Sequence, residues 1–112
     1  MLLPEPLVSV VIPHFNDIEG LKRALASLSV QDTRAFEVIV VDDGSVPAVR
    51  AALELVTSSW DFDVRTLYHV KNLGASGARN TGLVASRGSI ICLLDSDDLF
   101  LPGKLSWVID QI

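Results

Sequence analysis

Short apolar runs alternate with amphipathic segments along the chain. The runs, rich in β-branched residues, occupy positions 7–12, 36–41, 64–70 and 89–94. Between the first two, apolar side chains recur at the spacing of one helical face, as at Ile18, Leu21 and Leu25. The pattern predicts a strand in each run, the third nearer a sheet edge because it is more polar. Helices are expected between the strands, a third over 76–86 and a fourth from Pro102 onward.

Residues with known positional preferences mark the ends of these elements. Pro13 is expected to end the first strand, because proline has no N–H to donate to a ladder. Asn16 or Asp17 is placed to cap the first helix, and Ser45 the second.

Alternating strands and helices predict one α/β domain, a three-layer sandwich around a mostly parallel, Rossmann-like sheet with right-handed crossovers. Ligands of such sheets bind beyond the carboxyl ends of the strands. The segments that follow the expected strands should therefore gather at one edge. These segments are 13–16, 42–45, 71–77 and 95–98.

Composition narrows the class of protein. The chain has 112 residues, 49% of them hydrophobic, and a net charge of −5. This balance argues against disorder and against a basic nucleic-acid-binding domain. The single cysteine, Cys92, excludes a disulfide scaffold and is expected to fill the core. No apolar run reaches the ~20 residues of a membrane span, and the first residues do not form a secretory signal, so a cytoplasmic location is expected.

Half of the aspartates fall in two of the gathered segments. They are Asp42, Asp43, Asp95, Asp97 and Asp98. Clustered carboxylates need a cation or hydrogen-bond donors, and their oxygens suit Mg²⁺ or Mn²⁺ bridged to a diphosphate. No Cys/His cluster suits zinc. Simpler structural interpretations remain for single residues: Asp98 as a capping residue of the following turn, Gly74 as a turn residue, and Arg79 as a counter-charge instead of a phosphate ligand.

The two histidines are interpreted differently. His14 follows the first strand and is expected in the loop near the ligand, with a general-base role as the less favoured interpretation. His69 lies within the expected third strand and is interpreted as structural.

Four motifs in order resemble family 2 glycosyltransferases. They are VSVVIPHFN at 8–16, VVDDGS at 40–45, NLGASGARNTG at 72–82 and LLDSDD at 93–98. The resemblance implies a GT-A fold whose amino-terminal half binds a nucleotide-diphosphate sugar.

The same resemblance implies roles for individual residues. Those expected to bind the nucleotide sugar are Pro13, His14, Asn16, Asp42, Asp43, Gly74, Arg79 and Asp95. Asp42 is expected to hydrogen-bond the base and Asp95 to lie at the ribose. Asp97, together with Asp95, is expected to hold the divalent metal.

The family's catalytic domain is considerably longer than this chain. Residues 1–112 are therefore expected to be its donor-binding part, with the general base and the acceptor-binding half beyond Ile112. The whole protein would transfer a sugar, with inversion, from a donor such as a UDP-sugar to a glycan or lipid-linked acceptor. It is expected in the cytoplasm or at the inner face of the membrane. The fragment alone is expected to be inactive and, through uncovered apolar surface, to self-associate.

Other classes are weighed against this one. A non-catalytic nucleotide-binding or interaction module would share every binding residue. A phosphorylated receiver domain needs acids after the first strand, where this chain has PHFN. A dinucleotide-binding domain needs a glycine-rich turn there.

Overall fold

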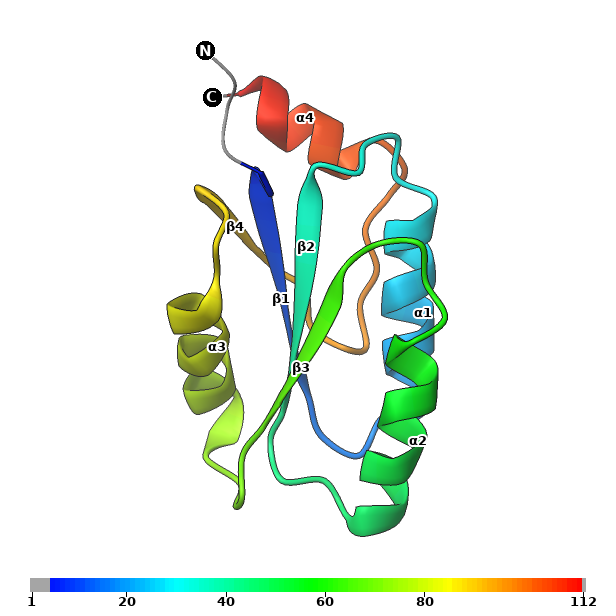
Figure 1. The fold of residues 1–112 in the computed structure, drawn as a ribbon, viewed down its shortest axis with the longest axis vertical. Helices are drawn as coiled ribbons and strands as arrows, with labels where there is room; N and C mark the ends of the chain where they lie inside the picture. Colours follow the sequence, from blue (N-terminus) through cyan, green and yellow to red (C-terminus); the bar gives the residue numbers. More distant parts are fainter. Residues whose placement is uncertain (1–4, 112) are drawn as a thin grey trace.

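Strands and helices alternate strictly in the computed structural model, which describes residues 5–111 (Figure 1). The strands are β1 (Val8–His14), β2 (Phe36–Asp42), β3 (Val64–Tyr68) and β4 (Ile90–Leu93). The helices are α1 (Ile18–Ser29), α2 (Pro47–Thr57), α3 (Gly74–Ala85) and α4 (Lys104–Asp110). Within these residues the strands form one parallel sheet in the order β3-β2-β1-β4. The expected α/β fold is therefore confirmed.

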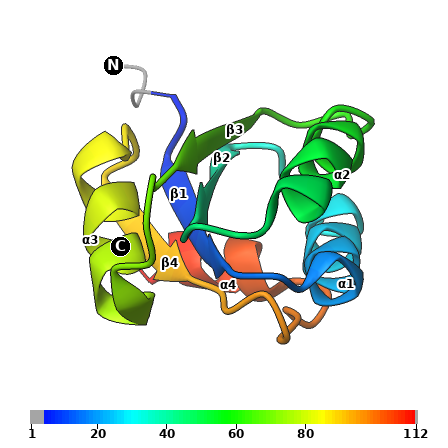
Figure 2. The ribbon, with the colours of Figure 1, turned by 90° about the horizontal axis from the view of Figure 1, so that it is seen from below.

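Helices cover both faces of the sheet. Figure 2 shows α3 on one face and α1 with α2 on the other, which makes the three layers. The strands β1 and β2 lie in the middle of the sheet and are almost wholly buried. Their side chains face helices on both sides, which explains why both runs are apolar at successive positions instead of alternating.

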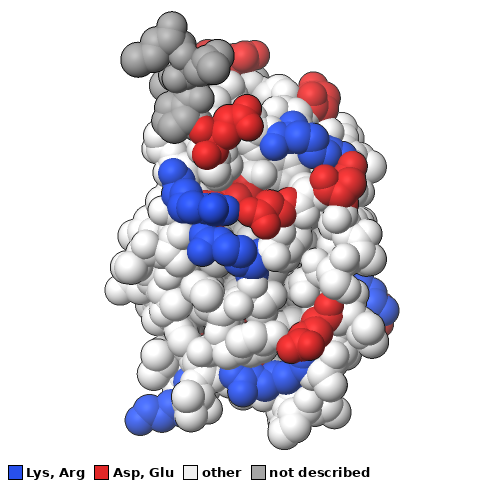
Figure 3. Space-filling model, viewed as in Figure 1, with Lys and Arg blue, Asp and Glu red and all other residues white. Residues whose placement is uncertain are grey.

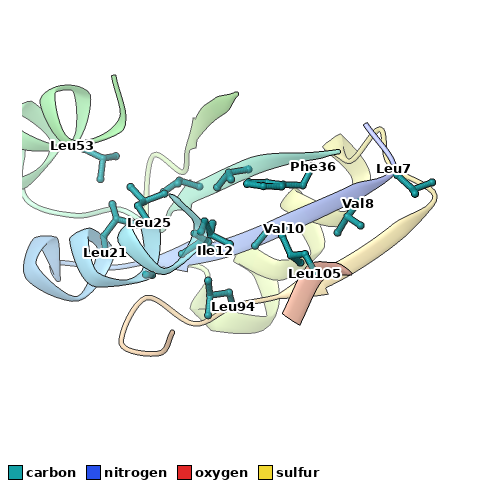
Figure 4. Close-up of a cluster of buried hydrophobic side chains, with 14 residues drawn as sticks. Leu7, Val8, Val10, Ile12, Leu21, Leu25, Phe36, Leu53, Leu94 and Leu105 are labelled. Carbon is teal, nitrogen blue, oxygen red and sulfur yellow. The ribbon is translucent and has the colours of Figure 1, made fainter. Parts of the chain in front are cut away.

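The main core lies between the sheet and the layer of α1. Val10 and Ile12 of β1 pack there with Leu21 and Leu25 of α1 and with Leu105 of α4 (Figure 4). On the opposite face a smaller cluster joins β2 to α3. Here helix and sheet approach closely, since a Cβ atom on Gly82 would lie 2.3 Å from Cγ1 of Val11.

The first strand does not end at Pro13, as the sequence predicted. It continues to His14, which pairs with Asp42 of β2. The backbone groups of successive residues in β1 point alternately toward β2 and toward β4. Val11 points toward β4, where its carbonyl accepts the N–H of Leu94. Pro13 faces that same side, beyond the last pair of β4, so no ladder bond requires its missing N–H.

Other boundaries also differ from expectation. The N-cap of α2 is Val46, because the Ser45 hydroxyl is engaged elsewhere. The third strand ends at Tyr68, and α3 begins two residues earlier than predicted, at Gly74. The strand β4 is only half-buried, since it lies at the sheet edge. The last helix, predicted from Pro102 onward, begins at Lys104 after the N-cap Gly103. Ile112, at the end of the predicted helix, lies outside the described residues.

A buried carboxylate organises the amino end of the sheet. Glu37 accepts hydrogen bonds from Ser9 Oγ at 2.6 Å, from the Arg87 N–H at 2.7 Å and from Arg65 at 3.1 Å. Burial raises the pKa of Glu37, but these donors outweigh it and lower the pKa from 4.5 to about 2. Arg87 also pairs with Asp63, with Nη2 2.8 Å from Oδ2. On the face shown in Figure 3, basic side chains lie beside acidic ones.

The helices of residues 5–111 include none that is both long and apolar enough to cross a lipid bilayer.

Candidate functional site

A cavity of about 380 Å³ opens at the carboxyl ends of the strands, the edge that Figure 2 faces. Every one of the four segments expected to gather there contributes to its wall. The lining residues are Pro13, His14, Phe15, Asp17, Asp43, Asn72, Gly74, Ala75, Ala78, Arg79, Asp95, Ser96 and Asp97.

One wall is anchored by a buried histidine at the end of β1. His14 Nδ1 lies 3.0 Å from Oδ1 of Asp42, and its Nε2 accepts the N–H of Asp17 at 3.1 Å. Because Nε2 is an acceptor, the hydrogen-bond network assigns the proton to Nδ1, which donates to Asp42. Asp17 in turn caps α1 by accepting the N–H of Gly20. Both ring nitrogens of His14 are thus engaged in positioning the chain, which disfavours a general-base role.

Asp42 lies behind the cavity. Its Oδ1 accepts from His14 and from Ser45 Oγ, and its Oδ2 accepts from the Ser45 N–H and from Arg50 Nε. These four bonds fill the lone-pair positions of a carboxylate. Burial raises the pKa of Asp42, but the four donors outweigh it, and the pKa lies below its ordinary value. The carboxylate is fully buried, so its geometry is that of a structural anchor.

The loop after β1 is tied to the loop after β2. The N–H of Asn16 donates to Ser45 Oγ at 2.8 Å, and Asn16 Oδ1 accepts the N–H of Val46 at 3.0 Å. Asn16 has a φ of 50°, a left-handed conformation that asparagine tolerates better than most residues. Its side chain is therefore used in joining two loops, and it does not line the cavity.

Asp43 lines the cavity and also caps α3. Its Oδ1 accepts from the N–H of Leu73 at 2.8 Å and lies 2.7 Å from His69 Nδ1, while its Oδ2 accepts from the N–H of Gly74 at 2.9 Å. Burial raises the pKa of Asp43, but these donors outweigh it and hold the pKa below its ordinary value. A carboxylate at a helix N-terminus is also favoured by the helix dipole.

An acidic cluster forms the wall that follows β4. One carboxylate oxygen from each of Asp95, Asp97 and Asp98 lies within 4.8 Å of the other two, and all three residues are exposed. Arg79 of α3 lies against the cluster, with Nη2 3.1 Å from Oδ1 of Asp95. Exposed carboxylate oxygens at this spacing fit a hard divalent cation such as Mg²⁺ or Mn²⁺.

The structure therefore brings together most, but not all, of the residues named from the sequence. Pro13, His14, Asp43, Gly74, Arg79, Asp95 and Asp97 line the cavity, whereas Asn16 and Asp42 stand behind it. Sequence reasoning did not single out Phe15 or Ser96, although each neighbours a residue that it did name. It also placed His69 in a strand, whereas His69 follows β3 and binds Asp43.

Comparison with known proteins gives a consistent result. The sequence model described as Glycosyl transferase family 2 matches residues 9–112. The succinoglycan biosynthesis protein ExoO of Rhizobium meliloti is 39% identical over 95% of this chain and 30% of its own length. The chain spans only 15% to 34% of the length of the first four curated relatives that it matches.

Solved structures share the fold. The crystal structure of S. aureus TarS 1–349 with UDP-GlcNAc aligns with a TM-score of 0.81 and 27% identity, over 92% of this chain and 30% of that one. The mannosyltransferase PcManGT of Pyrobaculum calidifontis, in complex with GDP-Man and Mn²⁺, aligns with a TM-score of 0.77 and 26% identity, over 88% of this chain and 31% of that one.

Proposed function

The chain belongs to glycosyltransferase family 2, and from this premise we propose that its cavity binds a nucleotide-diphosphate sugar, the donor for a glycosyl transfer. The observation that carries the proposal is the meeting of Arg79 with the acidic cluster at one wall of the cavity. A metal-bridged diphosphate needs both kinds of group: a carboxylate that binds the cation, and a guanidinium group that donates hydrogen bonds to phosphate oxygens.

The residues divide along the cavity. We place the nucleoside beside Pro13 and His14, at the wall that β1 builds, and the diphosphate toward Arg79 and the acidic cluster. Asp95 is assigned to the ribose and, with Asp97, to the cation. Gly74 and Asp43 bound the cavity on the side of α3.

Two of the expected ligands take an indirect part. Asp42 is fully buried and Asn16 does not line the cavity, so we assign both to positioning. Asp42 holds His14, and Asn16 holds the loop after β2.

The cation is assigned to the acidic cluster, as Mg²⁺ or Mn²⁺. When bound, it would offset the negative charge that develops on the departing nucleoside diphosphate. Arg79 would contribute fixed positive charge at the same place, and it is preorganised by its contact with Asp95. The Mn²⁺ in the PcManGT complex and the nucleotides in both compared structures support this assignment.

We propose that the whole protein transfers the sugar, with inversion, to a glycan or lipid-linked acceptor, as the name of ExoO suggests for a polysaccharide. The donor is proposed to be a UDP-sugar, with a GDP-sugar as the other candidate. We assign no general base among residues 5–111, because both nitrogens of the cavity's histidine are engaged and the cavity's aspartates are assigned to the cation, the ribose or helix capping. This chain alone is therefore proposed to bind the donor without transferring it.

Calorimetric titration tests donor binding. UDP and GDP are each added to the 112-residue chain with Mn²⁺ and, separately, with a chelator. We expect one of them to bind with Mn²⁺, and Asp97→Asn to weaken that binding at least about tenfold, the usual scale for loss of a metal-site group. Asp110→Asn, an exposed aspartate on α4, is the matched control and should bind like the wild type. Equal affinity in wild type and Asp97→Asn would contradict the metal assignment.

A non-catalytic nucleotide-binding module is the second candidate, and it predicts the same titration. A longer polypeptide that includes the rest of the family's catalytic domain separates the two. Release of UDP or GDP from a nucleotide sugar, dependent on an added acceptor, supports the transferase, and donor binding without release under every acceptor tested supports the module.

A further inference from the structure

His69 joins two parts of the cavity wall while lying outside the cavity itself. Its Nδ1 is 2.7 Å from Oδ1 of Asp43, and its Nε2 is 2.8 Å from Oγ1 of Thr81, in the second turn of α3. We propose that His69 is a positioning residue of the nucleotide site, one that holds Asp43 in place as the cap of α3. This inference rests on the proposed function, since it concerns the same cavity.

The helix α3 depends on Asp43 for its start. The residue at its N-cap is Leu73, whose side chain has no oxygen to accept a hydrogen bond. The Asp43 carboxylate, which comes from the end of β2, accepts the N–H groups of Leu73 and Gly74 instead. A capping interaction of this kind is normally made by a residue of the helix's own chain segment. Here it ties the helix to the sheet.

His69 fixes the orientation of this cap. The ring is buried and gives Asp43 a third donor, on the same oxygen that accepts from Leu73. Through Nε2 it also contacts the body of the helix at Thr81. A hydrophobic side chain of similar size would fill the space but would leave the Asp43 carboxylate with one donor fewer.

The helix held in this way carries the groups that face the proposed ligand. Gly74, Ala78 and Arg79 all lie on α3 and line the cavity. Arg79 meets Asp95 of the acidic cluster at 3.1 Å, a contact that a small shift or rotation of the helix would lengthen. Loss of the His69 hydrogen bonds should therefore displace α3 and weaken nucleotide binding, although His69 is not among the residues that line the cavity.

Three substitutions separate the two contacts of the ring. In His69→Asn the amide nitrogen takes the place of Nδ1 and can still donate to Asp43. In His69→Gln it takes the place of Nε2 and reaches only Thr81. His69→Ala removes both contacts.

Each variant of the 112-residue chain is titrated with UDP and with GDP in the presence of Mn²⁺, and amide hydrogen exchange is followed at Leu73 and Gly74. Exchange at Val38 and Val40 of β2 reports global stability.

We expect His69→Ala and His69→Gln to lower nucleotide affinity about tenfold, and His69→Asn to stay close to wild type, because outer residues that orient a ligand-binding group typically act on this scale. Exchange at Leu73 and Gly74 should speed up in the first two variants beyond any change at Val38 and Val40. Unchanged affinity in His69→Ala, or rescue by glutamine instead of asparagine, overturns the inference. A wild-type chain that binds neither nucleotide overturns the proposed function, whereas a binding wild type with an equally tight His69→Ala overturns only the role of His69.

Discussion

His14 donates a hydrogen bond from Nδ1 to Oδ1 of Asp42, 3.0 Å away, across the paired ends of β1 and β2. The two side chains are almost fully buried. Asp42 also holds the Ser45 hydroxyl and Arg50, so one carboxylate fixes the strand end, the following loop and a side chain of α2. The wall of the cavity is built on this carboxylate.

Removing the charge of Asp42 should destabilise the fold. In Asp42→Asn an NH₂ group, which can only donate, replaces one of the two accepting carboxylate oxygens. That group faces N–H or O–H donors, so at least one of the four buried hydrogen bonds is lost. We expect a loss of about 2–3 kcal/mol in the free energy of unfolding, measured with urea. The control Asp110→Asn should change it by less than about 0.5 kcal/mol. A stable Asp42→Asn would contradict the anchoring role.

The buried Glu37 should make stability depend on acid pH. Its pKa is lowered from 4.5 to about 2 in the folded chain, so the folded state favours the carboxylate. The stabilisation is complete above pH 4.5 and is lost as the pH falls through that value toward about 2. It amounts to about 3 kcal/mol at neutral pH. Urea unfolding between pH 7 and pH 2 should show a steeper loss for the wild type than for Glu37→Gln, and parallel curves for the two would contradict this.

The close approach of α3 to the sheet predicts a coupled pair of substitutions. Gly82→Ala places a methyl group 2.3 Å from Cγ1 of Val11, which should cost about 1–3 kcal/mol of stability. Val11→Ala removes that obstructing carbon and by itself leaves a small cavity. The double variant should be more stable than the sum of the two single effects predicts, as chemical denaturation of all four proteins in the cycle will measure. Simple additivity would argue against direct contact.

Arg79 should matter for binding more than for folding. It is partly exposed and pairs with the exposed Asp95, an arrangement that contributes little to stability. Arg79→Ala should leave the unfolding midpoint nearly unchanged and weaken binding of UDP or GDP with Mn²⁺ at least about tenfold, the loss of one charge-assisted contact. Arg23→Ala, on the exposed side of α1, serves as the control. If calorimetry showed equal nucleotide affinity for Arg79→Ala and Arg23→Ala, the proposed role of Arg79 in nucleotide binding would be wrong.

Hydrophobic periodicity predicted the order of elements and the edge where the site lies, because both follow from which faces are buried. The strand β1 was the clearest case, and the acidic run after β4 was placed correctly by the same rule. The orientation of individual side chains was not predictable in this way. Whether Asp42 or Asp43 faces the cavity depends on donors that lie 3 to 31 residues away along the chain, such as Ser45 and Gly74.

The same limit explains two of the helix starts that the sequence did not predict correctly, those of α2 and α3. A serine before a helix is a common cap, but the hydroxyl of Ser45 is already committed to Asp42. Leu73, the N-cap of α3, offers no capping oxygen, yet the helix begins directly after it because Asp43 supplies one from the end of β2. Local sequence carries no sign of either long-range bond.

Occupation of the α3 N-terminus by Asp43 also has a consequence for how the chain would respond to its surroundings. The positive end of the helix already holds a resident anion, so its peptide dipoles have little attraction left for an incoming diphosphate. The positive charge that balances the proposed diphosphate would therefore have to come from Arg79 and from a bound divalent cation. If the cavity binds a nucleotide diphosphate as proposed, its occupancy should depend on the concentration of free divalent cation as well as on that of the nucleotide.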